Sequence, residues 1–147
     1  KYMKQRKSFG QTIDKFQSLR HKIASLSSEI ESAKVFGYYC CELYNKNIYD
    51  VKLCSMAKLL VTELHEKVST ECLQFFGGNG FSEEYPLARA YRDDRINQIW
   101  EGTNEINRAI ITGYMMKKVR TLYLIIQGRY LQLDWDWKNG LIHISAD

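Results

Sequence analysis

The sequence contains little that would interrupt a helix. Its 147 residues include one proline, Pro86, and nine glycines. Proline and glycine are the residues that most often end helices and form the turns between strands. Their scarcity argues against a sheet of many short, turn-linked strands and predicts long uninterrupted helices. The 45% of hydrophobic residues are enough to form the core of a single domain.

The charge balance and the apolar runs argue against two further classes of protein. Lys and Arg number 21 and Asp and Glu number 17, so the net charge of +4 is small, and it is spread along the chain. Nucleic-acid binding therefore gets little support, because its usual signature is a clustered basic patch. No apolar run approaches the roughly 20 residues of a membrane span. We expect a soluble globular domain that forms the end portion of a longer protein.

The cysteines and histidines show no spacing typical of a metal site or a catalytic triad. The four cysteines lie in apolar stretches without C-x-x-C spacing: Cys40, Cys41, Cys54 and Cys72. Zinc sites and disulfide frameworks have paired or regularly spaced cysteines, so we expect buried, reduced thiols and no metal. We assign surface or packing roles to the histidines, which are His21, His65 and His143.

Apolar residues at intervals of three and four predict two long helices. The first runs from about Gln11 to Tyr44 and the second from Leu53 to Phe75, with a short polar link at residues 45–47. The glycine run Gly77–Gly80 ends the second helix, because glycine accepts the positive φ of a helix C-terminus. A short link between two long helices predicts that they are antiparallel.

Two further helices follow the glycine run. Pro86 suits the first turn of a third helix that extends to Arg95, since its missing N–H costs nothing there. The step from Glu101 to Gly102 breaks the chain, and Thr103 has the side chain of an N-cap for a fourth helix. The inner face of this last helix is expected to carry Ile106, Ile110 and Tyr114. The pattern predicts an all-α fold, an up-and-down four-helix bundle.

The C-terminal stretch has a different periodicity. Residues 131–138 alternate apolar and polar side chains, and Asn139-Gly140 precedes a second apolar run, which is a β-hairpin signal. An isolated hairpin is marginally stable, so we favour an irregular tail over a hairpin-like one. We divide the chain into a helical bundle at residues 1–118 and a tail at residues 119–147.

Three short stretches carry the strongest functional signal. They are RKSFG at residues 6–10, QFFGGNG at residues 74–80 followed by EYP at 84–86, and RDD at residues 92–94 running on to WEGT at 100–103. Their order and spacing on a helical bundle resemble the C-terminal domain of the acyl-CoA dehydrogenases. These flavoenzymes oxidise an acyl-CoA thioester between its α and β carbons. The resemblance covers residues 1–118.

The resemblance implies a catalytic role for Glu101. In the family this position removes the α-proton of the thioester while a hydride leaves the β-carbon for FAD, and its backbone N–H binds the thioester oxygen. Such a base must be desolvated, so we expect a buried acid with Trp100 as its aromatic wall and Gly102 allowing close approach of substrate. The alternative is a glutamate that only favours the dipole of the following helix. We assign Asp93, Asp94 and Arg95 to structural ion pairs.

The resemblance also implies a set of FAD contacts. An arginine fork, glycine backbone N–H groups and a helix N-terminus are all suited to bind a diphosphate. The implied residues are Arg6, Ser8, Phe9 and Gln17, then Gln74, Gly77 and Gly78 acting from a partner subunit, and Thr103 and Glu105. Taken singly, each has a structural alternative as a surface cation, an exposed polar residue or a helix cap.

The resemblance also implies properties of a whole protein that has further domains besides this chain. Family members bind acyl-CoA, pass electrons to an electron-transferring flavoprotein and form homodimers or homotetramers. We expect the mitochondrial matrix and fatty acid β-oxidation in a eukaryote, otherwise the cytoplasm, and no activity from this chain alone. The wording KQRKSFG, CMAK and GTNEI is similar to the long-chain branch, whose members often take the base from an earlier helix. The competing hypothesis is a catalytically silent helical self-association module.

Overall fold

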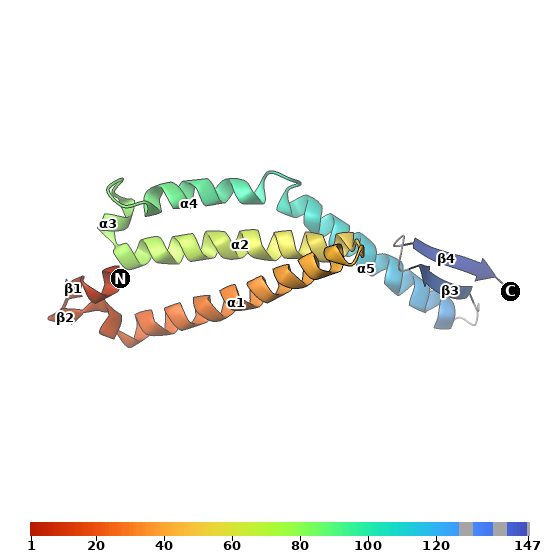
Figure 1. Ribbon diagram of the computed structural model, residues 1–147, viewed down its shortest axis with the longest axis horizontal. Coiled ribbons are helices and arrows are strands. Elements are labelled where there is room, and N and C mark those ends of the chain that lie inside the picture. The colour runs from red at the N-terminus through yellow and green to blue at the C-terminus, as the bar shows by residue number, and fades with distance from the viewer. Residues whose placement is uncertain (127–130, 137–140, 147) are drawn as a thin grey trace. The chain divides into compact units, whose positions relative to one another are not determined.

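The computed structural model describes residues 1–126, 131–136 and 141–146, with side chains described for residues 1–118 (Figure 1). The predicted all-α fold class is confirmed, and the four expected helices are α1, α2, α4 and α5. None of the described helices is both long and apolar enough to cross a membrane. The helices are α1 (Gln17–Asn45), α2 (Val51–Phe76), α3 (Gly78–Phe81), α4 (Leu87–Arg95) and α5 (Asn104–Ile126).

An α-helix was expected from about Gln11, but α1 begins only at Gln17 and the residues before it form other structures. Two 3₁₀ turns, η1 (Tyr2–Lys4) and η2 (Ile13–Lys15), flank a two-stranded hairpin of β1 (Lys7–Ser8) and β2 (Gln11–Thr12). The prediction that the first helix begins near Gln11 is therefore wrong by about two turns of helix. The apolar spacing continued through Ile13 because this side chain is buried from a 3₁₀ turn instead of from an α-helix.

A tight connection joins α1 to α2, as the polar link predicted. Asn47 adopts a left-handed conformation with φ of 59°, and the Ile48 N–H donates to the Leu43 carbonyl at 2.9 Å. The Asp50 carboxylate accepts from the Leu53 N–H at 2.8 Å and so caps the start of α2. The helices are thereby turned back on each other within five residues.

The glycine run ends α2 as predicted and then forms an unexpected helical turn. Gly77 has a left-handed φ of 57°, and α3 follows immediately. Pro86 precedes the first residue of α4, and its carbonyl accepts from the Ala90 N–H at 2.9 Å. The proline therefore stands at the N-cap, one position before the expected first turn.

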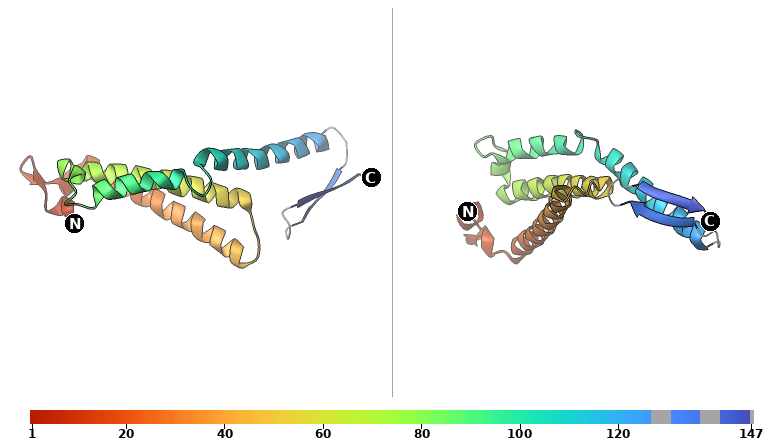
Figure 2. Two further views of the ribbon diagram at one scale, coloured as in Figure 1. Left: turned by 90° about the horizontal axis from the view of Figure 1, so that it is seen from above. Right: turned by 45° about the vertical axis from the view of Figure 1, so that its right-hand side comes forward.

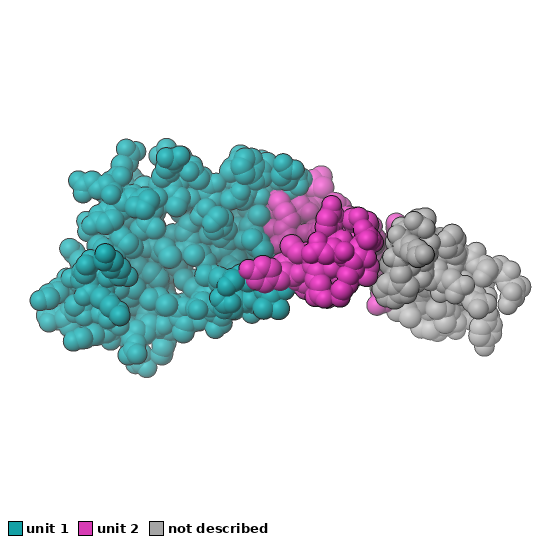
Figure 3. Space-filling model, viewed as in Figure 1, with its two compact units in different colours: residues 1–35, 60–102 teal, residues 36–59, 103–147 magenta. Residues whose placement is uncertain are grey.

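The chain divides into two compact units (Figure 3). The first comprises residues 1–35 and 60–102, and the second comprises residues 36–59 and 103–147. In the first unit, ion pairs of 2.7 Å link α1 to α2 through Lys22 with Glu71 and through Lys67 with Glu29. Its described apolar core is small and consists of Ile13, Leu26 and Ala33.

In the second unit, α5 does not bury the face expected from its sequence. Ile106 is 54% exposed and Tyr114 is 36% exposed, whereas Asn104 and Asn107 are buried. Asn104 accepts a hydrogen bond of 2.7 Å from Lys58, which satisfies its buried amide oxygen. The predicted inner face is therefore wrong for Ile106 and Tyr114, whereas Ile110 is half-buried. The face that the described residues cover best is polar and is paired by hydrogen bonds.

The tail forms the hairpin rather than the irregular alternative. Strand β3 (Leu131–Asp136) pairs antiparallel with β4 (Leu141–Ala146), and Leu131 lies opposite Ala146. The expected Asn139-Gly140 turn lies outside the described residues. Helix α5 continues through residue 118, so the division of the chain at that residue stays a prediction.

Candidate functional site

The N-terminal segment is fastened to the glycine run by an aromatic cluster. The Tyr2 ring stacks on Phe76 with centroids 3.8 Å apart, and Tyr85 packs edge-on against both. The Tyr2 hydroxyl donates to the Phe76 carbonyl at 3.3 Å and accepts from the Asn79 amide at 2.8 Å. These contacts place two of the three sequence motifs at one end of the first unit, as both views of Figure 2 show.

We call this region the glycine end and define it by seven of the predicted FAD contacts. The ion pair between Lys22 and Glu71 holds the start of α1 beside the end of α2. Gln17 and Gln74 lie close to this pair in sequence, on α1 and α2 respectively. The motifs at residues 6–10 and 74–80 are therefore neighbours in the fold, together with the start of α1. The members are Arg6, Ser8, Phe9, Gln17, Gln74, Gly77 and Gly78.

The Ser8–Gln11 turn presents its side chains to solvent. Phe9 and Gly10 both have positive φ, 50° and 79°, which is the conformation of a type I′ hairpin turn. Phe9 is 93% exposed, although its ring touches Phe16 edge-on with centroids 6.3 Å apart. Arg6 is also exposed, and its guanidinium has no ion pair within the described part of the chain. The segment from Arg6 to Gln11 therefore carries an exposed cation and an exposed ring.

The glycines of the run differ in whether packing requires a residue without a side chain. A Cβ added to Gly77 or Gly78 would meet nothing within 4 Å, so their backbone is open to an approaching ligand. A Cβ on Gly80 would lie 2.6 Å from the Leu73 carbonyl, so that glycine is required by packing. An open backbone, an exposed Arg6 and an exposed Phe9 ring fit the diphosphate and the heterocycle of FAD.

A second group of contacts fixes the chain that leads to Glu101. His65 on α2 lies 3.1 Å from the buried Asp94 carboxylate, and its Nδ1 lies 3.4 Å from the Asn97 amide nitrogen. A neutral ring with its proton on Nε2 satisfies both contacts. The Gln98 amide, in η3 (Ile96–Gln98), donates to the Glu66 carboxylate and to the Thr62 carbonyl. Thus α2 holds both α4 and η3.

The predicted structural ion pair is confirmed for Asp93, which accepts from Arg89 at 3.3 Å across one turn of α4. Asp94 instead accepts a hydrogen bond from His65 at 3.1 Å. Arg95 instead donates to the Gln98 side-chain oxygen at 3.3 Å. These residues position the backbone that leads to the turn and are accounted for by structure.

The Glu101 turn, defined as Trp100, Glu101 and Gly102, has an uncommon backbone. Glu101 has φ of 54° and Gly102 has φ of 83°, so two successive residues are left-handed. A non-glycine residue in this region costs about 1–2 kcal/mol. Glu101 is exposed, and among the described residues its carboxylate has no hydrogen-bond or ion-pair partner.

The expectation of a buried acid behind an aromatic wall is wrong for this chain. Glu101 is exposed, and Trp100 is 55% exposed. The physical reason is that the contacts made by η3 are directed toward α2, which leaves the following turn uncovered by the described residues. Desolvation of this carboxylate requires atoms other than those of the described residues.

The glycine end and the Glu101 turn are well separated along α2. Gln98 reaches the Thr62 carbonyl, and Gln74 lies 12 residues further along the same helix. At 1.5 Å per residue, the two levels are roughly 18 Å apart. The first unit therefore presents two separate sets of contacts, one around exposed glycines and one around a carboxylate.

The remaining predicted contacts belong to the start of α5 in the second unit. The Thr103 hydroxyl accepts from the Ile106 N–H at 3.3 Å, which confirms Thr103 as an N-cap. Glu105 lies exposed in the first turn. The N-terminal end of α5 is thus a regular capped start, in which one backbone donor is satisfied by the cap.

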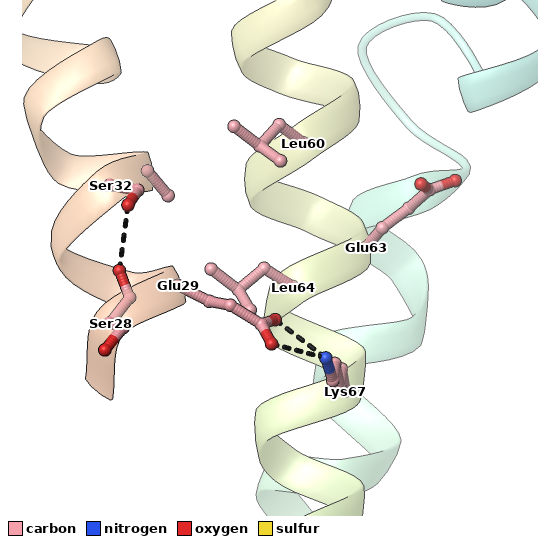
Figure 4. A pocket seen from close by; sticks show the side chains of 8 residues that line it. Ser28, Glu29, Ser32, Leu60, Glu63, Leu64 and Lys67 are labelled. Atoms are coloured by element: carbon pink, nitrogen blue, oxygen red, sulfur yellow. Dashed lines mark hydrogen bonds and ion pairs between the residues drawn. The ribbon is translucent and has the colours of Figure 1, made fainter. Parts of the chain in front are cut away.

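A pocket in the first unit includes none of the predicted site residues. It has a volume of about 420 Å³ and lies between α1 and α2, with Ala33, Leu60 and Leu64 among its lining residues. Figure 4 shows the Glu29 carboxylate paired with Lys67 beside it, at 2.7 Å and 2.8 Å. The pocket is lined by this ion pair, by apolar side chains and by Glu63, and it coincides with none of the three sequence motifs.

Sequence reasoning missed the residues that fasten the site elements. Tyr2 and Asn79 join the N-terminal segment to the glycine run, and Glu66 joins α2 to η3. Their partners are 32 to 77 residues away in sequence, so no local spacing indicated them. The aromatic Tyr2 just before a basic, glycine-containing turn was the one available signal.

Comparison with known proteins gives a consistent match over the helical part of the chain. The family described as "Acyl-CoA dehydrogenase, C-terminal domain" matches residues 1–116. The mouse mitochondrial long-chain specific acyl-CoA dehydrogenase is 42% identical over 110 residues, which are 75% of this chain and 26% of that protein. The chain thus spans about a quarter to a third of the length of the curated relatives it matches.

Solved structures give the same result. Butyryl-CoA dehydrogenase from Megasphaera elsdenii superposes with a TM-score of 0.76 at 38% identity, covering 78% of this chain and 30% of the other. The FAD complex of the protein PigA superposes with a TM-score of 0.73 at 28% identity, with the same coverage of both chains.

Proposed function

Because this chain belongs to the acyl-CoA dehydrogenase family, as its C-terminal helical domain, we propose that it forms part of an FAD-dependent enzyme that oxidises acyl-CoA thioesters. In this proposal Glu101 removes the α-proton of the thioester. Bound FAD would supply the acceptor for the hydride that leaves the β-carbon. The chain contributes the base and part of the cofactor site to an enzyme completed by other domains.

The observation that supports this role is the backbone at Glu101. A left-handed glutamate followed by a left-handed glycine is strained where glycine or asparagine would be relaxed. Strain of this kind persists where surrounding contacts impose it and is concentrated at functional sites. Here the imposed conformation exposes a carboxylate without a partner among the described residues, directly before the capped start of α5. A residue with only a helix-dipole role would need no such geometry.

The contacts around the turn supply positioning rather than basicity. Gln98 and Asn97 anchor the preceding residues to α2, so the carboxylate projects from a fixed backbone. The Glu101 N–H is a donor that suits the thioester oxygen, and Gly102 lets a substrate come close. A carboxylate in water is a weak base, so the remainder of the protein must exclude water here.

The glycine end is proposed to hold FAD. Arg6 would pair with the diphosphate, the Gly77 and Gly78 backbone would approach it, and Phe9 would contact the ring system. The remaining predicted contacts are Ser8, Gln17, Gln74, Thr103 and Glu105. Because the Glu101 turn lies roughly 18 Å away along α2, we assign the glycine end to the flavin of a second subunit.

The proposal extends to the partners of the whole protein. The substrate class is an acyl-CoA thioester, the electron acceptor is an electron-transferring flavoprotein, and the assembly is a homodimer or homotetramer. In a eukaryotic source the proposed compartment is the mitochondrial matrix, and the similar mouse enzyme is mitochondrial. The 147-residue chain alone is expected to bind FAD weakly and to oxidise no acyl-CoA.

The test is a single charge-neutral substitution in the whole protein. Glu101→Gln should abolish exchange of the substrate α-proton with deuterated water while FAD stays bound, since only the base is lost. Glu83→Gln is the matched control, because it removes another exposed glutamate charge. Exchange that survives Glu101→Gln would place the base elsewhere, such as before Lys1. A wild-type protein without exchange or bound FAD would favour the silent self-association module.

A further inference from the structure

Two cysteines lie at the same level of the α1–α2 hairpin in the second unit. Cys40 is five residues before the end of α1, and Cys54 is three residues after the start of α2. At 1.5 Å per residue these positions are about 7.5 Å and 4.5 Å from the connecting turn. In an antiparallel pair of helices the two positions therefore differ in level by about 3 Å, which is less than one helical turn.

The thiol of Cys40 is directed at the neighbouring backbone. Its Sγ donates to the Leu53 carbonyl at 3.8 Å, and that carbonyl belongs to the peptide bond that joins Leu53 to Cys54. The Cys54 N–H is held in turn by the Asp50 carbonyl at 3.0 Å. Cys40 thus touches the peptide unit of Cys54 from the opposite helix.

The two thiols differ in exposure and therefore in how easily an external reagent reaches them. Burial raises the pKa of Cys40, and the neighbouring Cys54, Cys41 and Asp50 raise it further. Cys40 is half-buried, whereas Cys54 is exposed, and both are free. An external reagent therefore reaches Cys54 first, and Cys40 is protected until a partner sulfur is brought to it.

We propose that Cys40 and Cys54 form a reversible disulfide that closes the α1–α2 hairpin by exchange with a low-molecular-weight disulfide such as oxidised glutathione. The bond would link the two helices across a connection that is already tight. It is independent of FAD and of acyl-CoA, and it assigns a redox modification to a surface outside the proposed catalytic site.

The exchange is balanced in two steps. The Cys54 thiolate attacks one sulfur of oxidised glutathione, which forms a mixed disulfide and releases one glutathione thiolate. Cys40 then loses its proton and attacks the Cys54 sulfur, which breaks the mixed disulfide and releases the second glutathione thiolate. Two protein thiols are oxidised, one glutathione disulfide is reduced, and the two protons end on the released thiols.

The other two cysteines provide matched controls. Cys41 follows Cys40 directly and is therefore turned by about 100° around the helix axis. Cys72 lies 18 residues beyond Cys54 on α2, about 27 Å along the helix, in the first unit. Among the described residues, neither makes the hydrogen bond to the Leu53 carbonyl that Cys40 makes.

The experiment oxidises the 147-residue chain with oxidised glutathione and maps the linked peptides by mass spectrometry without reduction. We expect a Cys40–Cys54 link within one chain, reversed by dithiothreitol. The link should raise Tm by about 5 °C or more relative to the reduced chain, because it constrains the unfolded state. Cys41→Ser and Cys72→Ser should retain the link and the shift, whereas Cys40→Ser and Cys54→Ser should lose both.

Several results would overturn the proposal. They are a stable Cys41–Cys54 link, a link between two chains, a glutathione adduct that stays on Cys54, or no oxidation at all. Helix content measured on each reduced variant by circular dichroism separates loss of the bond from loss of the fold. Should Cys40→Ser misfold, Cys40→Ala and alkylation of Cys54 in the wild-type chain give the same comparison.

Discussion

Replacing Glu101 by glycine should make the chain more stable while it removes the proposed base. The left-handed φ of 54° costs a non-glycine residue about 1–2 kcal/mol relative to glycine in the folded state. Glycine offsets part of this gain through its larger unfolded-state entropy, which costs about 0.5–1 kcal/mol. The net expectation is a stabilisation of about 0.5–1 kcal/mol, because Glu101 has no described partner to lose. In Tm this corresponds to about 1–4 °C.

The assay is urea and thermal unfolding of the 147-residue chain followed by circular dichroism. Glu101→Gln keeps the same backbone requirement, so its stability should stay within about 0.5 kcal/mol of wild type. Asn47→Gly tests a left-handed residue outside the proposed site and should give a smaller gain, since asparagine tolerates φ of 59° better than glutamate does. A Glu101→Gly chain that is no more stable than wild type, beside an Asn47→Gly chain that is, would refute the strained turn.

Three further outcomes follow from single contacts. Thr103→Ala should lower the free energy of unfolding by about 1 kcal/mol by removing the N-cap of α5, and Thr103→Ser should restore most of it in the same urea titration. Gly80→Ala should destabilise by about 1–3 kcal/mol because its Cβ would lie 2.6 Å from the Leu73 carbonyl, whereas Gly78→Ala should have a much smaller effect in differential scanning calorimetry. Burial raises the pKa of Cys72, so the folded state holds that proton more tightly than the unfolded state. Stability should therefore be full below the ordinary thiol pKa of about 8.5 and decline as pH rises above it, and Cys72→Ala should weaken this alkaline decline in unfolding at stepped pH.

The sequence predicted helix content well because regular apolar spacing determines it locally. The last residue of α2 was predicted from the glycine run, and the start of α4 was predicted from Pro86. Both signals act within one or two residues of the helix boundary. The start of α1 was missed because a buried Ile13 in a 3₁₀ turn continues the same spacing. Periodicity therefore located the helices better than it located their first residues.

Burial was predicted less well because it depends on what covers each helix face. The apolar stripe of α5 was expected to be inside, yet Ile106 is 54% exposed and Asn107 is buried. A spacing pattern shows that one face is apolar, but the covering atoms can belong to other domains. The same reasoning explains Glu101, whose residue type and turn were identified from the motif while its exposure was not. Long-range hydrogen bonds such as the one between Tyr2 and Asn79 are not indicated by any local sequence pattern.

The exposure of Glu101 separates the two things that a carbon acid base requires. One is a fixed position, and this chain provides it through the left-handed pair at Glu101 and Gly102 and through the anchoring of Gln98 to α2. The other is exclusion of water, which increases the basicity of a carboxylate and must come from atoms other than those of the described residues. In this proposal, contacts within the C-terminal domain hold the strained backbone of Glu101. The carboxylate becomes a stronger base only when other parts of the protein cover the turn. The domain is then expected to keep the φ of Glu101 unchanged between the isolated chain and the whole enzyme, because the contacts that impose it are already complete.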